Sequence, residues 1–186
     1  MLLILRTIKH PHREARDMQK FMLAAIEQSK GNQSSQSVDL PITALLTNPN
    51  TSEILLTAHD TRISGRHPLN HPIMLLLNQL PTLLPGNVSA AALGYNSLDE
   101  EEQYYAHMYD VYITHEPCTM CCMALVHSRI RRLIFWKSTK TGARALGWMK
   151  GDQDGTLNHR YMCFEGIPGA LGDDAHVGMI SDDVCA

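Results

Sequence analysis

The sequence contains no long apolar run, no excess of basic charge and no regular spacing of cysteines. Its opening, MLLILR, is a short apolar stretch without a preceding basic region, and it is shorter than a signal-peptide core or a membrane span. The 186 residues include 16 Lys and Arg against 19 Asp and Glu, which argues against a strongly basic nucleic-acid binder. We therefore expect an intracellular globular protein with no membrane contact.

The five cysteines are clustered. Three of them lie in the motif CTMCC (118–122), and Cys185 lies almost at the C-terminus. A secreted protein held by disulfides spaces its cysteines more evenly, whereas clustered thiols in a reducing compartment indicate a metal site.

The spacing of apolar residues predicts one α/β domain. A strand–helix–strand unit builds parallel sheets, so we expect a three-layer α/β arrangement. An Asn-Pro pair at 48–49 predicts that the first two strands form a hairpin. We divide the chain into an N-terminal helix with a polar loop (1–37) and a domain with a C-terminal tail (38–186). The expected helices are residues 14–26, 71–80 and 117–128, and the expected strands are residues 40–47, 53–58, 110–114, 132–136 and 160–166.

Three residues form a candidate zinc site: His71, Cys118 and Cys121. The two cysteines are three residues apart on a predicted helix, so both sulfurs project from one face. His71 and Cys118 each lie beside a proline at a predicted helix start, so the two starts can converge on one ion. Two readings compete with this one. The cysteines can be small buried residues, and Cys122, one turn from Cys118, can replace Cys121 as the ligand.

The same residues resemble the H-x-E…P-C-x-x-C signature of the zinc nucleobase deaminases, except that Ile73 stands where the signature has Glu. The segments HPLNHPI (67–73), YITHEPCTMCCMALVHSRIRRLIFW (112–136) and LNHRYMCFEG (157–166) resemble tRNA adenosine deaminases, in particular the non-catalytic subunits of the eukaryotic wobble-adenosine enzymes. The resemblance covers roughly residues 38 to 166.

The resemblance implies a three-layer α/β/α cytidine-deaminase-like fold with a mixed sheet of about five strands, and Zn²⁺ as the cofactor. It also implies a heterodimer with a catalytic deaminase subunit, the anticodon arm of tRNA as a second partner, and a location in the nucleus and cytoplasm. Members of this branch carry a longer N-terminal region, whereas here about forty residues precede the first predicted strand.

Because Ile73 replaces the Glu, we expect this chain to be inactive without a partner and to contain no catalytic residue. In an active deaminase the Glu moves protons while a zinc-activated water attacks the base. Isoleucine has no proton to exchange, and general acid–base catalysis contributes about 10² to 10⁴ in rate. Glu116 is the nearest other carboxylate in the sequence, but it is not an obvious substitute, because active members of the family carry a Glu at both positions.

A closed structural zinc site has four protein ligands, so we looked for a fourth. The C-terminal segment SDDVCA offers Cys185 first, and also Asp182, Asp183 or the terminal carboxylate. The alternative is a frayed terminus without a role.

A stretch of cations without any acid follows the metal motif. These residues are candidate phosphate contacts, although a solvated charged surface explains them equally well. Trp136 and Trp148 lie in the same stretch and can stack on bases or belong to the core. The cations are Arg129, Arg131, Arg132, Lys137, Lys140, Arg144 and Lys150.

Two other functions fit the same residues. A free-standing nucleoside or base deaminase would need an unusual acid in place of Glu. A zinc-stabilised interaction module would have no link to tRNA. The purified chain, assayed alone on tRNA, adenosine and cytidine, separates the first of these from an inactive subunit.

Overall fold

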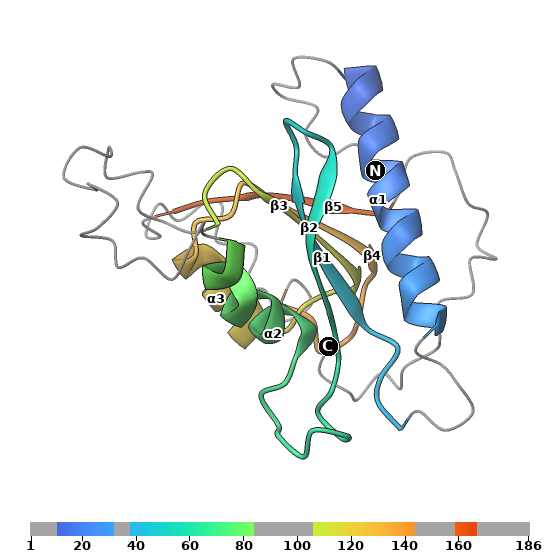
Figure 1. The fold of residues 1–186 in the computed structure, drawn as a ribbon, viewed down its shortest axis with the longest axis vertical. Helices are drawn as coiled ribbons and strands as arrows, with labels where there is room; N and C mark the ends of the chain where they lie inside the picture. The colour runs from blue at the N-terminus through green and yellow to red at the C-terminus, as the bar shows by residue number, and fades with distance from the viewer. Residues whose placement is uncertain (1–10, 32–37, 84–105, 144–158, 167–186) are drawn as a thin grey trace.

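A five-stranded mixed sheet forms the middle of the structure (Figure 1). The computed structural model describes residues 11–31, 38–83, 106–143 and 159–166. The strand order is β2-β1-β3-β4-β5; β1 pairs antiparallel with β2 and β3, and β3, β4 and β5 run parallel. The predicted strands and the mixed sheet are confirmed. The strands are β1 (Thr43–Asn48), β2 (Glu53–His59), β3 (Asp110–His115), β4 (Arg132–Lys137) and β5 (Met162–Glu165).

Helices cover both faces of this sheet, which confirms the three-layer prediction. Helix α1 (Pro11–Gly31) lies on one face, and α2 (Pro72–Gln79) and α3 (Thr119–His127) lie together on the other (Figure 1). A short 3-10 turn, η1 (Leu80–Leu83), continues α2, so Pro81 lies inside that turn instead of ending the helix directly. None of the helices that the structure describes is both long and apolar enough to cross a membrane.

The alternation of side chains along the strands produces two separate cores. Leu45, Tyr112 and Ile134 face α1, where the rings of Phe21 and Tyr112 lie 5.4 Å apart. Their neighbours along the same strands belong to the larger core under α2 and α3. That larger core includes Ala44, Leu46, Val111, Ile113, Leu133 and Phe135.

The predicted hairpin between β1 and β2 is confirmed. Its turn is closed by Asn48, whose side-chain oxygen accepts the N–H groups of Asn50 at 2.9 Å and Thr51 at 3.4 Å. Ser52 then adopts a positive φ of 55°, and its N–H donates to the Asn48 carbonyl. The hairpin therefore depends on a local side-chain contact as well as on the Asn-Pro signal.

Candidate metal centre

His71 is placed by the start of α2. Pro72 occupies the first turn, where its missing N–H costs no hydrogen bond, and His71 is the extended residue just before it. The imidazole makes no capping hydrogen bond to the helix, and the residue is buried. The helix start therefore fixes the backbone of His71 and leaves its ring for other contacts.

Cys118 occupies the equivalent position at the start of α3. It follows Pro117 as the extended N-cap residue, and Cys121 lies in the first turn of the helix. The helix thus begins two residues later than the expected residue 117, and Pro117 precedes its N-cap. Both thiols are buried.

The two helix starts bring the three predicted ligands together. One side-chain donor atom from each of His71, Cys118 and Cys121 lies within 4.8 Å of the others. The His71 Nδ1 to Cys118 Sγ distance is 3.9 Å. Tetrahedral zinc, with bonds of about 2.1 Å to nitrogen and about 2.3 Å to sulfur, would hold such a pair about 3.6 Å apart. The arrangement therefore fits a zinc ion.

Cys122 lies outside this group. Its Sγ contacts the Pro117 carbonyl at 3.8 Å, and burial raises the pKa of its thiol to about 12 although a hydrogen bond with Tyr161 acts to lower it. A metal ligand has to be a thiolate, and the buried surroundings of this thiol disfavour that charged form. The structure places Cys121, not Cys122, beside the other two donors.

Ile73 lies in the same core as the donors. It is completely buried in the first turn of α2 and belongs to the cluster that contains Cys118 and Cys121. Among the described residues, no carboxylate joins the three-donor group.

Glu116 is held by the loop after β4. Its carboxylate accepts the N–H of Thr139 at 3.2 Å, and the residue is fully buried. Two backbone hydrogen bonds also join this loop to the segment around Glu116: the Glu116 N–H donates to the Lys137 carbonyl, and the Ala143 N–H donates to the Pro117 carbonyl. A Cβ on Gly142 would come within 2.3 Å of the carboxyl carbon, so the loop fits closely around this side chain. Glu116 therefore positions the chain just before Cys118.

Sequence reasoning missed Asp60 and Arg62. Asp60 is buried directly after β2, and Arg62 pairs with it through Nε at 2.8 Å and Nη2 at 2.7 Å. The Arg62 Nη1 atom lies 3.4 Å from the Nε2 atom of His71. The only signal in the sequence is the short spacing of these opposite charges in the loop before His71.

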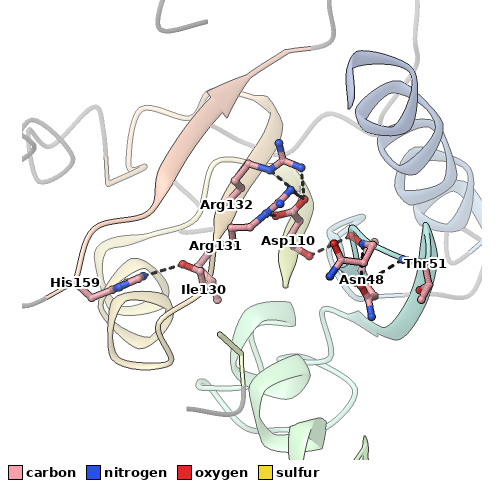
Figure 2. A network of polar contacts seen from close by, with 9 residues as sticks. Asn48, Thr51, Asp110, Ile130, Arg131, Arg132 and His159 are labelled. Atoms are coloured by element: carbon pink, nitrogen blue, oxygen red, sulfur yellow. Dashed lines mark hydrogen bonds and ion pairs between the residues drawn. The ribbon is translucent and has the colours of Figure 1, made fainter. Parts of the chain in front are cut away.

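Two of the predicted RNA contacts have a different partner. Arg131 and Arg132 both donate to Asp110, at 2.9 Å and 2.6 Å for the shortest contacts. Figure 2 shows both side chains turned toward Asp110. Arg132 and Asp110 are buried, and Arg131 contacts the same carboxylate, while the contact of these two arginines with RNA stays a prediction.

The remaining candidates divide between described and undescribed parts of the chain. Trp136 is half-buried and packs against the core under α1. Arg129, Lys137 and Lys140 are described, and their contact with RNA stays a prediction. Arg144, Trp148, Lys150, Asp182, Asp183 and Cys185 lie outside the described residues.

Comparison with known proteins agrees with this geometry. Residues 15–137 match the cytidine and deoxycytidylate deaminase zinc-binding region. A Danio rerio protein named "Probable inactive tRNA-specific adenosine deaminase-like protein 3" is 32% identical over 81% of this chain and 47% of its own length. The "tRNA-specific adenosine deaminase subunit TAD3" of Saccharomyces cerevisiae is 33% identical over 78% of this chain and 42% of its own. The chain thus spans about half the length of these relatives.

A solved structure from a study of A-to-I editing by tRNA:A34 deaminases shares the fold. It has a TM-score of 0.53 and 21% identity, and the match covers 82% of this chain and 99% of that one. With the family match over most of the described chain, and with the metal donors at the helix starts, this chain belongs to the cytidine and deoxycytidylate deaminase zinc-binding family.

Proposed function

We propose that this chain is a non-catalytic subunit of a heterodimeric tRNA adenosine-34 deaminase. In this role it binds a structural zinc, pairs with a catalytic subunit and helps to hold the anticodon arm of tRNA, in the nucleus and cytoplasm. The names of the relatives, which describe a deaminase subunit and an inactive deaminase-like protein, support this assignment.

The observation that carries the proposal is Ile73. In catalytic deaminases zinc activates a water, and a Glu beside the metal moves the proton to the base and the leaving amine. Here the position two residues after His71 holds a fully buried hydrocarbon side chain. Glu116 is the nearest carboxylate in sequence to the cysteines, and it is committed to the Thr139 loop. Among the described residues, no carboxylate therefore joins the three donors as a catalytic Glu would.

Zinc in such a site contributes stability. His71, Cys118 and Cys121 would hold the ion, and it would join the start of α2 to the start of α3. We further propose Cys185 as the fourth ligand, because a closed structural site has four protein donors.

The RNA contact is assigned to the cations that stay outside the Asp110 pairs. Arg129 follows α3, and Lys137 and Lys140 flank the loop that clasps Glu116. The Glu116 carboxylate anchors the backbone at Thr139, between the two lysines, and a fixed backbone would present both cations on one part of the surface.

Co-expression tests the proposal. The chain is produced alone, with a catalytic tRNA deaminase subunit, and as an Ile73→Glu variant alone, and inosine is measured at position 34 of tRNA. We expect inosine only where the catalytic subunit is present, because the buried environment of residue 73 need not accept a base even when the carboxylate is restored. Strong deamination by the wild-type chain alone would refute the assignment.

Deletion of residues 181–186 tests the fourth ligand separately. We expect the deletion to reduce zinc retention against a chelator and to lower the melting temperature. The substitution Cys185→Ser in the full chain distinguishes the thiol from the carboxylates of the same segment. Unchanged zinc retention in both variants would refute the assignment of Cys185 while leaving the three other ligands in place.

A further inference from the structure

The Asp60–Arg62 ion pair lies beside His71, one of the three candidate metal donors. The Asp60 side chain is completely buried, and that of Arg62 is 15% exposed. The backbone N–H of Arg62 also donates to Asp60, at 3.1 Å. The Nε and backbone N–H groups of Arg62 donate to the Asp60 carboxylate, and Nη2 lies 2.7 Å from it as an ion-pair contact, so the guanidinium is held near one orientation.

This orientation directs Nη1 of Arg62 at the ring of His71. The distance to Nε2 is 3.4 Å, while Nδ1 on the other side of the ring faces the sulfur of Cys118. A guanidinium has five N–H donors and no acceptor. Any hydrogen bond between the two groups therefore runs from Arg62 to an Nε2 atom that carries no hydrogen.

This polarity is the reverse of that of an ordinary zinc histidine. A neutral imidazole has one N–H, and when Nδ1 binds a metal the hydrogen is on Nε2. Metal-binding histidines usually donate that hydrogen to a carboxylate, a carbonyl or a water. Here the Nε2 side faces a cation that can only donate. The contact with Arg62 favours the ring form with its hydrogen on Nδ1, which can donate to Cys118 and cannot bind metal through that atom.

We propose that Arg62, held by Asp60, is a positioning residue that lowers the affinity of the centre for zinc and stabilises its metal-free form. The inference rests on the proposed zinc site and adds its regulation. The centre then has two self-consistent arrangements: three donors on an ion, or a hydrogen-bonded series from Asp60 through Arg62 and His71 to Cys118.

Zinc affinity tests this inference. The full chain, Arg62→Gln and Arg66→Gln are titrated with zinc in competition with a colorimetric chelator at one neutral pH. Arg66 is the matched control, because it lies in the same loop, is exposed and loses the same charge. We expect Arg62→Gln to bind zinc about 10-fold more tightly, the scale of effect known for groups that contact a metal ligand. Arg66→Gln should bind like the wild type.

A structural role alone would not tighten the binding. Loss of the ion pair leaves Asp60 buried without its arginine, so general destabilisation would weaken zinc binding or leave it unchanged. The double variant Asp60→Asn/Arg62→Gln removes both charges and keeps two hydrogen-bonding amides, and it should show the same tightening. In the chelator-treated proteins, Arg62→Gln should melt at a lower temperature than Arg66→Gln.

The outcomes are distinct. Equal or weaker zinc binding by both Arg62 variants overturns the inference while the zinc site stands. Failure of the wild type and of every variant to bind zinc removes the proposed site and the inference with it. Tighter binding by Arg62→Gln and by the double variant, with an unchanged control, supports the inference.

Discussion

The two ends of β3 carry buried polar groups of opposite character. At the start of the strand, Asp110 is surrounded by the guanidinium groups of Arg131 and Arg132, so the charges are compensated within the chain. Just beyond the end of the strand, Cys118 meets His71 and Cys121, which are donors that suit an ion from outside. The difference shows that burial of polar groups alone does not mark a binding site. What distinguishes the two ends is the chemistry of their groups: a carboxylate and two guanidinium groups neutralise one another, whereas an imidazole and two thiols are a donor set for a metal ion.

The strand register explains the compensated end. Asp110 lies directly beside Arg132 in the parallel pair of β3 and β4, and the backbone N–H of Arg131 donates to Tyr109. A buried carboxylate held by two arginines fixes the start of both strands. The Asp110 end of β3 therefore stabilises the fold, and the end near Cys118 carries the candidate metal donors.

The largest expected effect comes from breaking the compensated end. Asp110→Ala leaves the buried Arg132 without its carboxylate, and we expect the free energy of unfolding to fall by about 3–5 kcal/mol. Urea denaturation measures this change. Arg160→Ala, an exposed arginine on the neighbouring segment, is the control and should cost less than about 0.5 kcal/mol. Similar losses for both variants would show that the Asp110 pairs contribute little.

The next largest effect tests whether Cys121 or Cys122 is the metal ligand. Cys121→Ser should weaken zinc binding by about 100-fold or more, because one of the three donors is lost. Cys122→Ser, on the next residue of the same helix, should retain zinc, since that thiol contacts the Pro117 carbonyl. Chelator competition gives both affinities. Loss of zinc in Cys122→Ser with retention in Cys121→Ser would reverse the assignment.

A substitution with a smaller expected effect tests whether the Glu116 carboxylate has a structural role. Gly142→Ala places a methyl group against the carboxyl group of Glu116, and such overpacking costs about 1–3 kcal/mol of unfolding free energy. If the contact with Glu116 is the cause, the same substitution in a Glu116→Ala background should cost much less. Thermal denaturation of the four proteins completes this cycle, and equal costs in both backgrounds would exclude the contact.

The smallest effect concerns the loop that carries Arg62. Burial acts to raise the pKa of Asp39, but hydrogen bonds from the side chain and backbone of Ser64 and from the backbone of Ile63 lower it below its usual value overall. The stabilisation is therefore present above the unfolded pKa of about 3.9 and is lost as the pH falls through the folded pKa. Asp39→Asn should lower the melting temperature by less than about 2 °C at pH 7. The difference from the wild type should vanish near pH 2.

Much of this fold is predictable from local sequence. Apolar periodicity locates α1, and β-rich runs bounded by turn residues locate all five strands. The grouping of His71, Cys118 and Cys121 is also predictable, because a proline beside each helix start and the C-x-x-C spacing are local features. These residues depend on short-range geometry, which a sequence displays directly.

The rest depends on which distant segments become neighbours. No local pattern shows that Asp110 meets Arg131 and Arg132, since the pairing is created by the parallel register of β3 and β4. The run of cations between residues 129 and 150 therefore does not show that Arg132 is buried beside Asp110. Likewise, the contact of Arg62 with His71 depends on the path of the loop between β2 and α2.

The sequence separation of His71 and Cys118 would make a zinc ion bound between them an indicator of the native state. These residues are 47 positions apart, so the unfolded chain would have to close a long loop to bring them to one ion. Loop closure of that length costs about 3.4 kcal/mol, or roughly 300-fold in affinity, before any constant term. Release of zinc into solution should therefore accompany loss of the fold, and a chromogenic chelator would follow unfolding without any label on the protein.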